Sequence, residues 1–334
     1  MLVPRAGTGT LWGTSMATAI HLRFTHDRSS SEPTPPKSPE PPWQPSSLLA
    51  ARLAIGSARG TSGRRRSRSR RGRRDGPRIR PDTSWAVMTS LRSVDARLGR
   101  LHAQGSFSDG ELQGLPDLVH RYFRASIASG TPLAQSARLR MHGAVRVGKW
   151  WLPFRAEQIL SPLHGYLWAA RVARVVVGSD RYVDGDGAME WKLLGRINLM
   201  LAEGPDVSRS AAGRAGAEAV WVPTAMLPRF GVAWSARDPH HITARYPVDD
   251  LDLTLDYTLD HHARVRSIAL DRWGAPDNNE QARLHRFVHE LTRVSTFGGL
   301  TIPSAGRGGW FDGVDCWRDA EFFRYEITDL SLVE

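Results

Sequence analysis

Apolar positions recur every three or four residues in two stretches of the chain. The first stretch begins at Met88, and its apolar stripe comprises Leu91, Val94, Leu98 and Leu101. The second begins at Leu115, with Pro116 suited to a first helical position, and its apolar face comprises Leu118, Val119, Tyr122, Phe123 and Ile127. Because one face of a helix repeats every ~3.6 residues, this spacing predicts two amphipathic helices.

After Pro132 the period changes to two, which is typical of strands with one face on a core and one in water. Ala137–Val147 alternates apolar residues with Arg and His, and Asp250–Asp260 alternates without a break. Shorter runs predict strands at residues 150–154, 166–168, 232–235, 241–246, 265–273, 286–296 and 322–332. No helix follows each strand, so we expect an antiparallel meander.

The fold class that these elements predict is α+β, mostly antiparallel β. We expect a curved sheet or half-open barrel with N-terminal helices and a helical insertion at residues 204–228, where Ala211–Ala219 is rich in alanine. The run Asp184-Gly185-Asp186-Gly187 lies between apolar residues and predicts a hairpin turn, because glycine tolerates positive φ. A calcium loop also begins Asp-x-Asp, but Ala188 replaces the third acidic ligand and no bidentate Glu follows.

The formal net charge of +11 belongs to the first 87 residues. They contain 15 Arg and one Lys against five acids, and the rest of the chain carries 29 basic and 29 acidic side chains. A basic pI usually suggests nucleic-acid or anionic-membrane binding. That inference does not extend to the folded part, for which no nucleic-acid partner is predicted.

Residues 1–87 are expected to be a disordered basic and Pro-rich tail, and residues 88–334 a single β-rich domain. Residues 29–46 are mostly Ser, Pro and Glu, and residues 64–74 contain eight Arg, so neither stretch can offset the entropy of ordering it. Three interpretations stay open: an arm for anionic surfaces, a solvated low-complexity tail, and an over-long gene whose true start is Met88. We favour the third and then the second, since no aromatics are interleaved with the Arg.

Cysteine usage and hydropathy indicate a reducing compartment. Cys316 is the only cysteine, so no disulfide framework exists, and a buried apolar role is favoured over a nucleophile because no nucleophile motif surrounds it. A spanning helix needs about 20 apolar residues, and no stretch of the chain supplies them. No secretory core with a cleavage site is recognised. We therefore expect a cytoplasmic protein without a transmembrane segment.

Motifs for cofactors and metals are absent from the sequence. There is no Walker loop, no Gly-x-Ser-x-Gly elbow and no dinucleotide fingerprint, so no cofactor is predicted. His285 and His289 are four residues apart and share a face in a helix or a strand. A metal site there would need a third ligand that the sequence does not identify, so polar packing is favoured and no metal is expected.

Glu218 is the carboxylate that stands out, because its neighbours Ala217, Ala219, Val220 and Trp221 suggest partial burial. A buried Glu needs a partner or shifts its pKa upward. One interpretation makes it a catalytic general acid or base. The favoured one makes it a structural Glu paired with Arg214 or Arg272.

Several short motifs occur in a fixed order along the chain. They are Leu115-Pro116 with Arg121-Tyr122-Phe123, His142-Gly143, Trp168-Ala169-Ala170, Asp180-x-Tyr182-x-x-Gly185-x-Gly187-x-Met189, Glu218-x-x-Trp221-x-Pro223, Arg272-Trp273, and Gly299-Leu300-x-Ile302-Pro303. Through them, over most of residues 115–330, the chain resembles an uncharacterised bacterial family, the domain-of-unknown-function family numbered 6544. The resemblance implies no activity. The order of strands and insertion is also similar, at the level of fold, to the open half-barrels of bacterial lipoprotein carriers, and fold does not assign function.

Two hypotheses from different classes follow. In the first, the domain is a non-enzymatic binding module whose Trp-lined concave face holds an apolar or amphipathic, lipid-like small molecule, with candidate contacts Trp150, Phe154, Tyr166, Trp168 and Trp221. In the second, it is an enzyme that uses Glu218 with a His or Arg partner. A core completely filled by the helices is an equally available explanation of the aromatic positions. We favour the binding module over the enzyme.

Overall fold

The computed structural model describes residues 93–333 except residues 102, 104, 276–280 and 312–315. The expectations for the tail, and Leu91 of the first predicted helix, lie outside the described residues. Residues 93–98 are helical, with Val94 and Leu98 buried as the apolar stripe requires. In the part of the chain that is described, no helix is long and apolar enough to cross a membrane.

The second predicted helix is α3 (Asp117–Ser126), preceded by the 3-10 helix η1 (Asp109–Leu112). Pro116 is the residue before the first helical turn and not its first member, and its carbonyl accepts hydrogen bonds from the N–H groups of Val119 and His120. The predicted face is buried, and it contacts β7 and β12 of the sheet. Spacing therefore identified the buried side of this helix correctly.

Thirteen antiparallel strands form one sheet that does not close into a barrel, which confirms the predicted fold class. Their order across the sheet is β6-β5-β4-β3-β2-β1-β13-β12-β11-β10-β9-β8-β7. The strands are β1 (Ala137–Val147), β2 (Trp150–Ser161), β3 (Gly165–Val172), β4 (Val176–Val183), β5 (Asp186–Leu193), β6 (Ile197–Glu203), β7 (Ala233–Asp238), β8 (His241–Val248), β9 (Leu251–Leu259), β10 (Val265–Gly274), β11 (Arg283–Phe297), β12 (Leu300–Trp310) and β13 (Glu321–Leu332).

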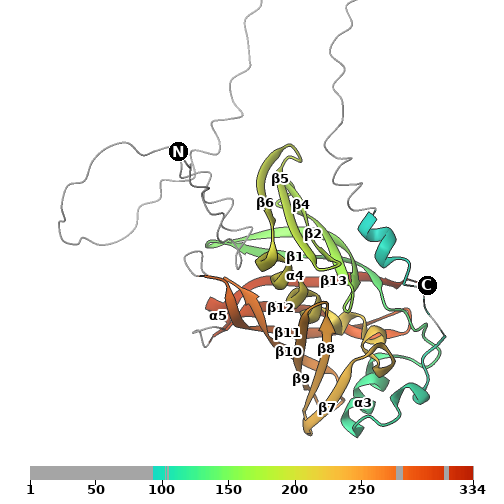
Figure 1. Ribbon diagram of the computed structural model, residues 1–334. Helices are drawn as coiled ribbons and strands as arrows, with labels where there is room; N and C mark the ends of the chain where they lie inside the picture. The colour runs from blue at the N-terminus through green and yellow to red at the C-terminus, as the bar shows by residue number, and fades with distance from the viewer. Residues whose placement is uncertain (1–92, 102, 104, 276–280, 312–315, 334) are drawn as a thin grey trace, which may run out of the picture. The chain divides into compact units, whose positions relative to one another are not determined.

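The sheet has two meandering wings that meet where β1 pairs with β13. One wing runs from β1 out to the edge strand β6, and the other runs from β13 out to the edge strand β7. The predicted insertion is the link between these two edges. It consists of α4 (Pro205–Ala217), η2 (Ala219–Trp221), η3 (Pro223–Met226) and η4 (Pro228–Phe230), and α4 packs against strands of both wings (Figure 1).

Small residues allow α4 to lie close to the sheet. Its sequence ends in Ala-Ala-Gly-Arg-Ala-Gly-Ala, and a Cβ added at Gly213 would stand only 2.8 Å from Cγ of Arg272. Real Cβ atoms essentially never come so close, so any other residue at this position would force the Arg272 side chain or the helix to move. The Ala-rich run that predicted a helix is also what brings the helix against β10.

The Asp-Gly turn is confirmed and two strands were missed. Asp184 and Gly185 have φ values of 56° and 78°, as a two-residue hairpin between β4 and β5 requires. Strand β12 was not predicted because Pro303 and three glycines interrupt its pattern. The pairing of β11 with β12 shifts register near Val294, which pairs with Pro303, and a bulge is where a strand tolerates proline. The other missed strand is the edge strand β6.

Candidate functional site

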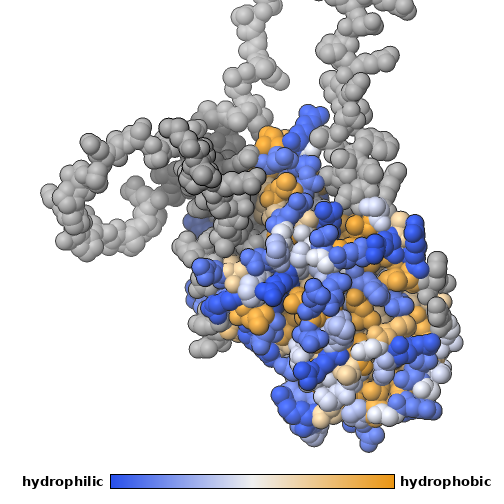
Figure 2. Space-filling model, viewed as in Figure 1, coloured by the Kyte–Doolittle hydropathy of each residue, from blue (hydrophilic) through white to orange (hydrophobic). Residues whose placement is uncertain are grey.

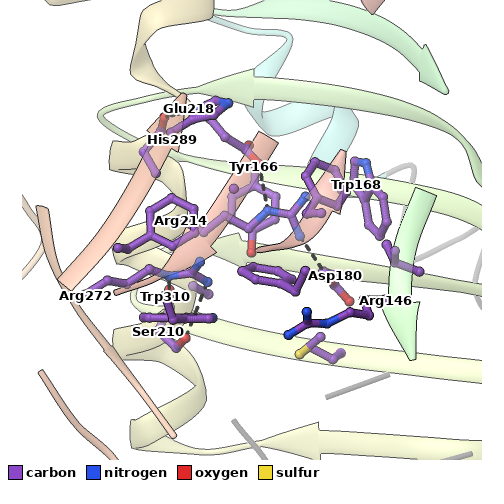
Figure 3. Close-up of a pocket in the computed structure, with 18 of the residues that line it drawn as sticks. Arg146, Tyr166, Trp168, Asp180, Ser210, Arg214, Glu218, Arg272, His289 and Trp310 are labelled. Atoms are coloured by element: carbon purple, nitrogen blue, oxygen red, sulfur yellow. Dashed lines mark hydrogen bonds and ion pairs between the residues drawn. The ribbon is translucent and has the colours of Figure 1, made fainter. Parts of the chain in front are cut away.

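A cavity of about 160 Å³ lies between α4 and the inner face of the sheet, and we call it the α4 cavity. Strands β1, β3, β4, β5, β10, β11, β12 and β13 contribute to its wall, together with α4 and η2. Residues far apart in sequence therefore meet here, because the sheet bends round the helix that joins its two edges (Figure 3).

Aromatic rings form most of the apolar wall. On one wing Trp168 lies 5.8 Å from Trp191 between ring centres. From β13 of the other wing, Phe323 lies 6.3 Å from Trp168, and Phe322 stacks on Trp310 at 6.2 Å. Alternation explains Trp168 and Trp191, whereas the neighbours Phe322 and Phe323 both reach the cavity where the pairing of β12 with β13 shifts register.

Arg214 lies at the centre of the polar part of the cavity. Its Nε donates a 2.8 Å hydrogen bond to Oε1 of Glu218, and its Nη1 donates a 2.9 Å bond to Oδ2 of Asp180 (Figure 3). The guanidinium lies 4.8 Å from the ring centres of both Tyr166 and Trp168. Position 218 is four residues after position 214, so the end of α4 supplies both the cation and one anion.

Every remaining oxygen of the two carboxylates has a partner. Gln158 of β2 donates from Nε2 to Oε2 of Glu218 at 2.5 Å, and the indole Nε1 of Trp191 donates to Oδ1 of Asp180 at 2.9 Å. Burial raises the pKa of the Asp180 carboxyl, although Arg214 and Trp191 oppose the shift. Burial alone would lower the pKa of Arg214, but the charges around it, led by Glu218, outweigh burial and raise the pKa. Arg214, Glu218 and Asp180 thus form a buried, hydrogen-bonded ion cluster.

Arg272 of β10 is partly buried and has no direct ion pair of this kind, although Glu218 and Asp180 act on it at longer range. It donates to the carbonyl oxygen of Ser210 at 3.1 Å and lies 5.4 Å and 5.2 Å from the ring centres of Phe287 and Trp310. Among the described residues, no carboxylate lies within ion-pairing distance of it. Burial lowers the pKa of Arg272 to about 10, so the side chain is still charged at neutral pH.

Three buried indole donors belong to residues that line the cavity. The Nε1 atoms of Trp168, Trp221 and Trp310 have no hydrogen-bond partner in the described structure. A buried donor without an acceptor costs stability, so such groups in a cavity indicate a missing acceptor. The cavity wall therefore contains a guanidinium and three indole N–H groups that could serve a molecule carrying acceptor atoms.

His289 of β11 lines the same cavity but is engaged by the protein. Its Nδ1 lies 3.2 Å from the carbonyl oxygen of Ala217, and its Nε2 lies 2.8 Å from the hydroxyl of Tyr325. Burial lowers the pKa of His289 to about 4. The ring is therefore neutral at pH 7, with Nδ1–H donating to the carbonyl and Nε2 accepting from the tyrosine.

Comparison with models of protein families identifies the family of this chain. A family model, described as a family of unknown function (DUF6544), matches residues 105–320, which is more than half of the chain. The chain belongs to this family. The resemblance inferred from the motifs is confirmed, and the matched range contains the α4 cavity except for the residues contributed by β13. No curated protein matches the chain.

Solved structures resemble this DUF6544 member weakly. A LolA superfamily protein from Nitrosomonas europaea has 8% identity and a TM-score of 0.37, over 64% of this chain and 91% of that one. A domain described as an outer membrane lipoprotein-sorting protein from Vibrio parahaemolyticus has 6% identity and a TM-score of 0.36, over 65% and 91%. A DUF1329 family protein from Desulfovibrio piger has 11% identity and a TM-score of 0.31, over 65% and 90%. Likenesses of this size transfer no function to this chain.

The structure brings three of the five sequence-selected aromatic residues together at the cavity: Tyr166, Trp168 and Trp221. Phe154 lies behind them, with its ring 5.5 Å from that of Trp168. Trp150 lies apart from the cavity wall, because it sits at the start of β2 with 64% of its surface exposed. Alternation predicted which side chains share a face of the sheet. It could not predict which part of that face is covered by other segments of the chain.

Glu218 has the kind of partner that the sequence analysis favours. Of the two arginines considered, Arg214 pairs with it and Arg272 does not. Sequence reasoning missed Asp180, which completes the ion cluster, and Trp310, which lies on the unpredicted strand β12. The only signal for Asp180 was its place in the Asp-x-Tyr family motif.

Metal-ligating side chains do not gather anywhere in the described residues, where no group of three His, Cys, Asp or Glu could hold an ion. His285 and His289 both point to the buried face of β11. His285 lies with its ring 6.1 Å from Trp310, in T-shaped contact. These positions are those of packed core histidines.

Proposed function

We propose that this protein is a non-enzymatic binding module, and that the α4 cavity holds a small amphipathic molecule whose anionic or acceptor-rich end meets Arg272. The observation that carries the proposal is a set of indole N–H groups without acceptors among the described residues, those of Trp168, Trp221 and Trp310, in the same cavity wall as Arg272, whose guanidinium has no direct ion pair there. Glu218 and Asp180 act on Arg272 only from beyond ion-pairing distance, so its charge is incompletely compensated. An anion bound beside Arg272 would supply the missing partner.

The apolar wall indicates the rest of the ligand. Trp191, Phe322 and Phe323 present ring surface to the cavity, which suits an aliphatic or aromatic body. The volume of about 160 Å³ compares with a cavity of roughly 150 Å³ that accommodates benzene. The part of the ligand that enters is therefore about the size of one ring, and a longer chain would have to extend beyond the cavity.

One observation favours a second candidate, an enzyme that uses Glu218 with an Arg or His partner. Glu218, Arg214 and His289 all line the same cavity. Their reactive atoms are engaged within the protein, however, since both oxygens of Glu218 accept hydrogen bonds and both ring nitrogens of His289 have partners. A general base must direct a lone pair at its substrate. The binding module is therefore the better-supported function.

Native mass spectrometry of the purified full chain, before and after solvent extraction, tests the proposal directly. We expect a bound small molecule that extraction removes.

A titration then tests whether the anionic end of a ligand binds beside Arg272. It uses two probes of equal ring size, benzoate and benzyl alcohol, and follows binding through tryptophan fluorescence. Benzoate should bind more tightly, and Arg272→Gln should weaken benzoate about tenfold or more while changing benzyl alcohol little. Arg264→Gln, on the exposed turn before β10, is the control. Absence of any co-purified molecule together with no binding of either probe would refute the module.

A further inference from the structure

Three hairpin turns lie at one end of the β1–β6 wing. Cross-strand pairs Phe154–Val172, Val172–Val176, Val176–Leu193 and Leu193–Ile197 form one row across the strands. The β3–β4 and β5–β6 turns lie just beyond this row, and the β1–β2 hairpin extends four residues further, to the pair Val147–Trp150. We call the residues exposed there the tip surface: Lys149, Trp150, Arg174, Val175, Leu194, Arg196 and Ile197.

Large apolar side chains are exposed on each tip. Trp150, Leu194 and Ile197 are 64%, 65% and 52% exposed, and Val175 is 41% exposed. Only two other large apolar residues of the described chain are exposed, and one of them, Leu201, lies on the adjacent edge strand β6. Figure 2 shows apolar and polar residues side by side on the β5–β6 hairpin that projects at the top of the view. Apolar residues gathered in this way mark an interaction surface.

Basic residues predominate at these tips. Residues 146–150, 171–177 and 192–198 contain six Lys and Arg and no Asp or Glu, although Lys192 pairs with Glu190 and Arg146 donates to the carbonyl oxygens of Arg318 and Asp319. Next to the tips, Arg155 of β2 stands directly opposite Arg171 of β3, and both are exposed. Like charges directly opposite each other on neighbouring strands destabilise a sheet. A negatively charged partner would relieve this repulsion, whereas the same surface of a second copy of the chain would increase it.

We propose that the tip surface docks on a lipid bilayer that contains anionic lipids. Tryptophan and aliphatic side chains that project from turns enter the headgroup region, and flanking Lys and Arg meet the phosphates. The tips present both apolar and basic side chains. A soluble anion would contact only the basic ones, whereas a bilayer surface would contact both. The first tip follows Val145 and Arg146, which line the α4 cavity, so docking brings the cavity wall next to the membrane. This inference goes beyond ligand binding and does not depend on it.

A local fluorescence probe tests docking in the full chain. In a Cys316→Ser background, Ile197→Cys is labelled with the environment-sensitive dye NBD, and Asp186→Cys, at the opposite end of strand β5, is the matched control. With vesicles of phosphatidylcholine and phosphatidylglycerol, we expect a blue-shifted, brighter emission from position 197 and none from position 186. Vesicles of phosphatidylcholine alone should give a much weaker response. No change at position 197, or equal changes at both positions, overturns the proposal.

The Arg-rich residues 64–74 could also attract anionic vesicles, and the same experiment separates this outcome. Binding through those residues alone would sediment the chain with vesicles and leave the dye at position 197 unchanged, which would refute docking by the tips. Reversing three tip charges, with Lys149→Glu, Arg174→Glu and Arg196→Glu, should weaken the response roughly 100-fold. The matched triple change Arg121→Glu, Arg245→Glu and Arg264→Glu, away from the tips, should leave the response in place.

Discussion

Arg214 and Glu218 are one helical turn apart at the end of α4, and they face the sheet rather than the solvent. The 2.8 Å bond from Nε to Oε1 leaves the Nη1 atom of Arg214 free to reach Asp180 on β4, 34 residues earlier in the chain. The insertion is thereby tied to the wing of the sheet that precedes it. Four predictions follow from this cluster and from the cavity around it.

Glu218→Gln is expected to destabilise the protein by ~3–5 kcal/mol, because it removes one partner of a buried ion pair. The measurement is urea unfolding of the variant beside the unaltered chain. Glu203→Gln is the control, since Glu203 is exposed and lies 3.9 Å from Arg181, and it should change stability by less than ~0.5 kcal/mol. Unchanged stability with loss of a discovered activity would instead favour catalysis by Glu218.

Trp168→Ala is expected to cost ~3–5 kcal/mol, because the ring packs against Phe154, Trp191 and Phe323. Trp168→Phe keeps an aromatic ring in this packing, but it removes the indole N–H, which has no acceptor among the described residues, together with part of the ring surface. Its cost should stay near 1 kcal/mol while benzoate binding weakens. If the alanine variant lost little stability, the ring would line a larger open pocket. If the phenylalanine variant bound benzoate as well as the unaltered chain, the indole N–H would not contact the ligand.

Arg272→Met is expected to raise the unfolding free energy of the ligand-free protein by about 1 kcal/mol. The change removes a buried charge that has no carboxylate partner and keeps an apolar chain against Phe287 and Trp310. The same variant should lose benzoate binding. The free energy of unfolding would then increase while the affinity for benzoate decreases. Such a trade-off is typical of residues that serve binding at the expense of stability. A strong loss of stability would show that the guanidinium serves the fold.

Stability is expected to fall as pH drops from 6.5 to about 4, because of His289. Its folded pKa is about 4 against an ordinary value of 6.5, so in this window the unfolded chain binds more protons than the folded one. Stability therefore rises with pH across the window, by ~3 kcal/mol from this group. Urea unfolding at several pH values should show the slope, and His289→Gln should reduce it. Asp180, whose pKa burial raises, acts in the opposite direction in both proteins, so the difference between them isolates His289.

Local patterns by themselves determined the elements of this protein. Strand β1 has the bounds that its alternation predicts, and the Asp184-Gly185 turn follows from the conformations that glycine allows. The Ala-rich insertion and the buried face of α3 were also readable, since periods of two and 3.6 are properties of a single segment. The apolar neighbours of Glu218 also predicted that it needs a basic partner, for which Arg214 and Arg272 were the first candidates.

Only the tertiary structure decided which of these residues meet. The pairing of β1 with β13 and the passage of α4 between the edge strands depend on contacts between distant segments, for which a single sequence has no local signal. That topology assigns Arg214 to Glu218 and Asp180, and it places Trp310 from an unpredicted strand in the cavity wall. Within the part of the chain that the structure describes, it also leaves Arg272 without an ion pair. The topology also leaves Trp150 exposed, away from the other aromatic residues on the same face of the sheet. Alternation shows which face a side chain is on, whereas burial depends on which other segments cover that face.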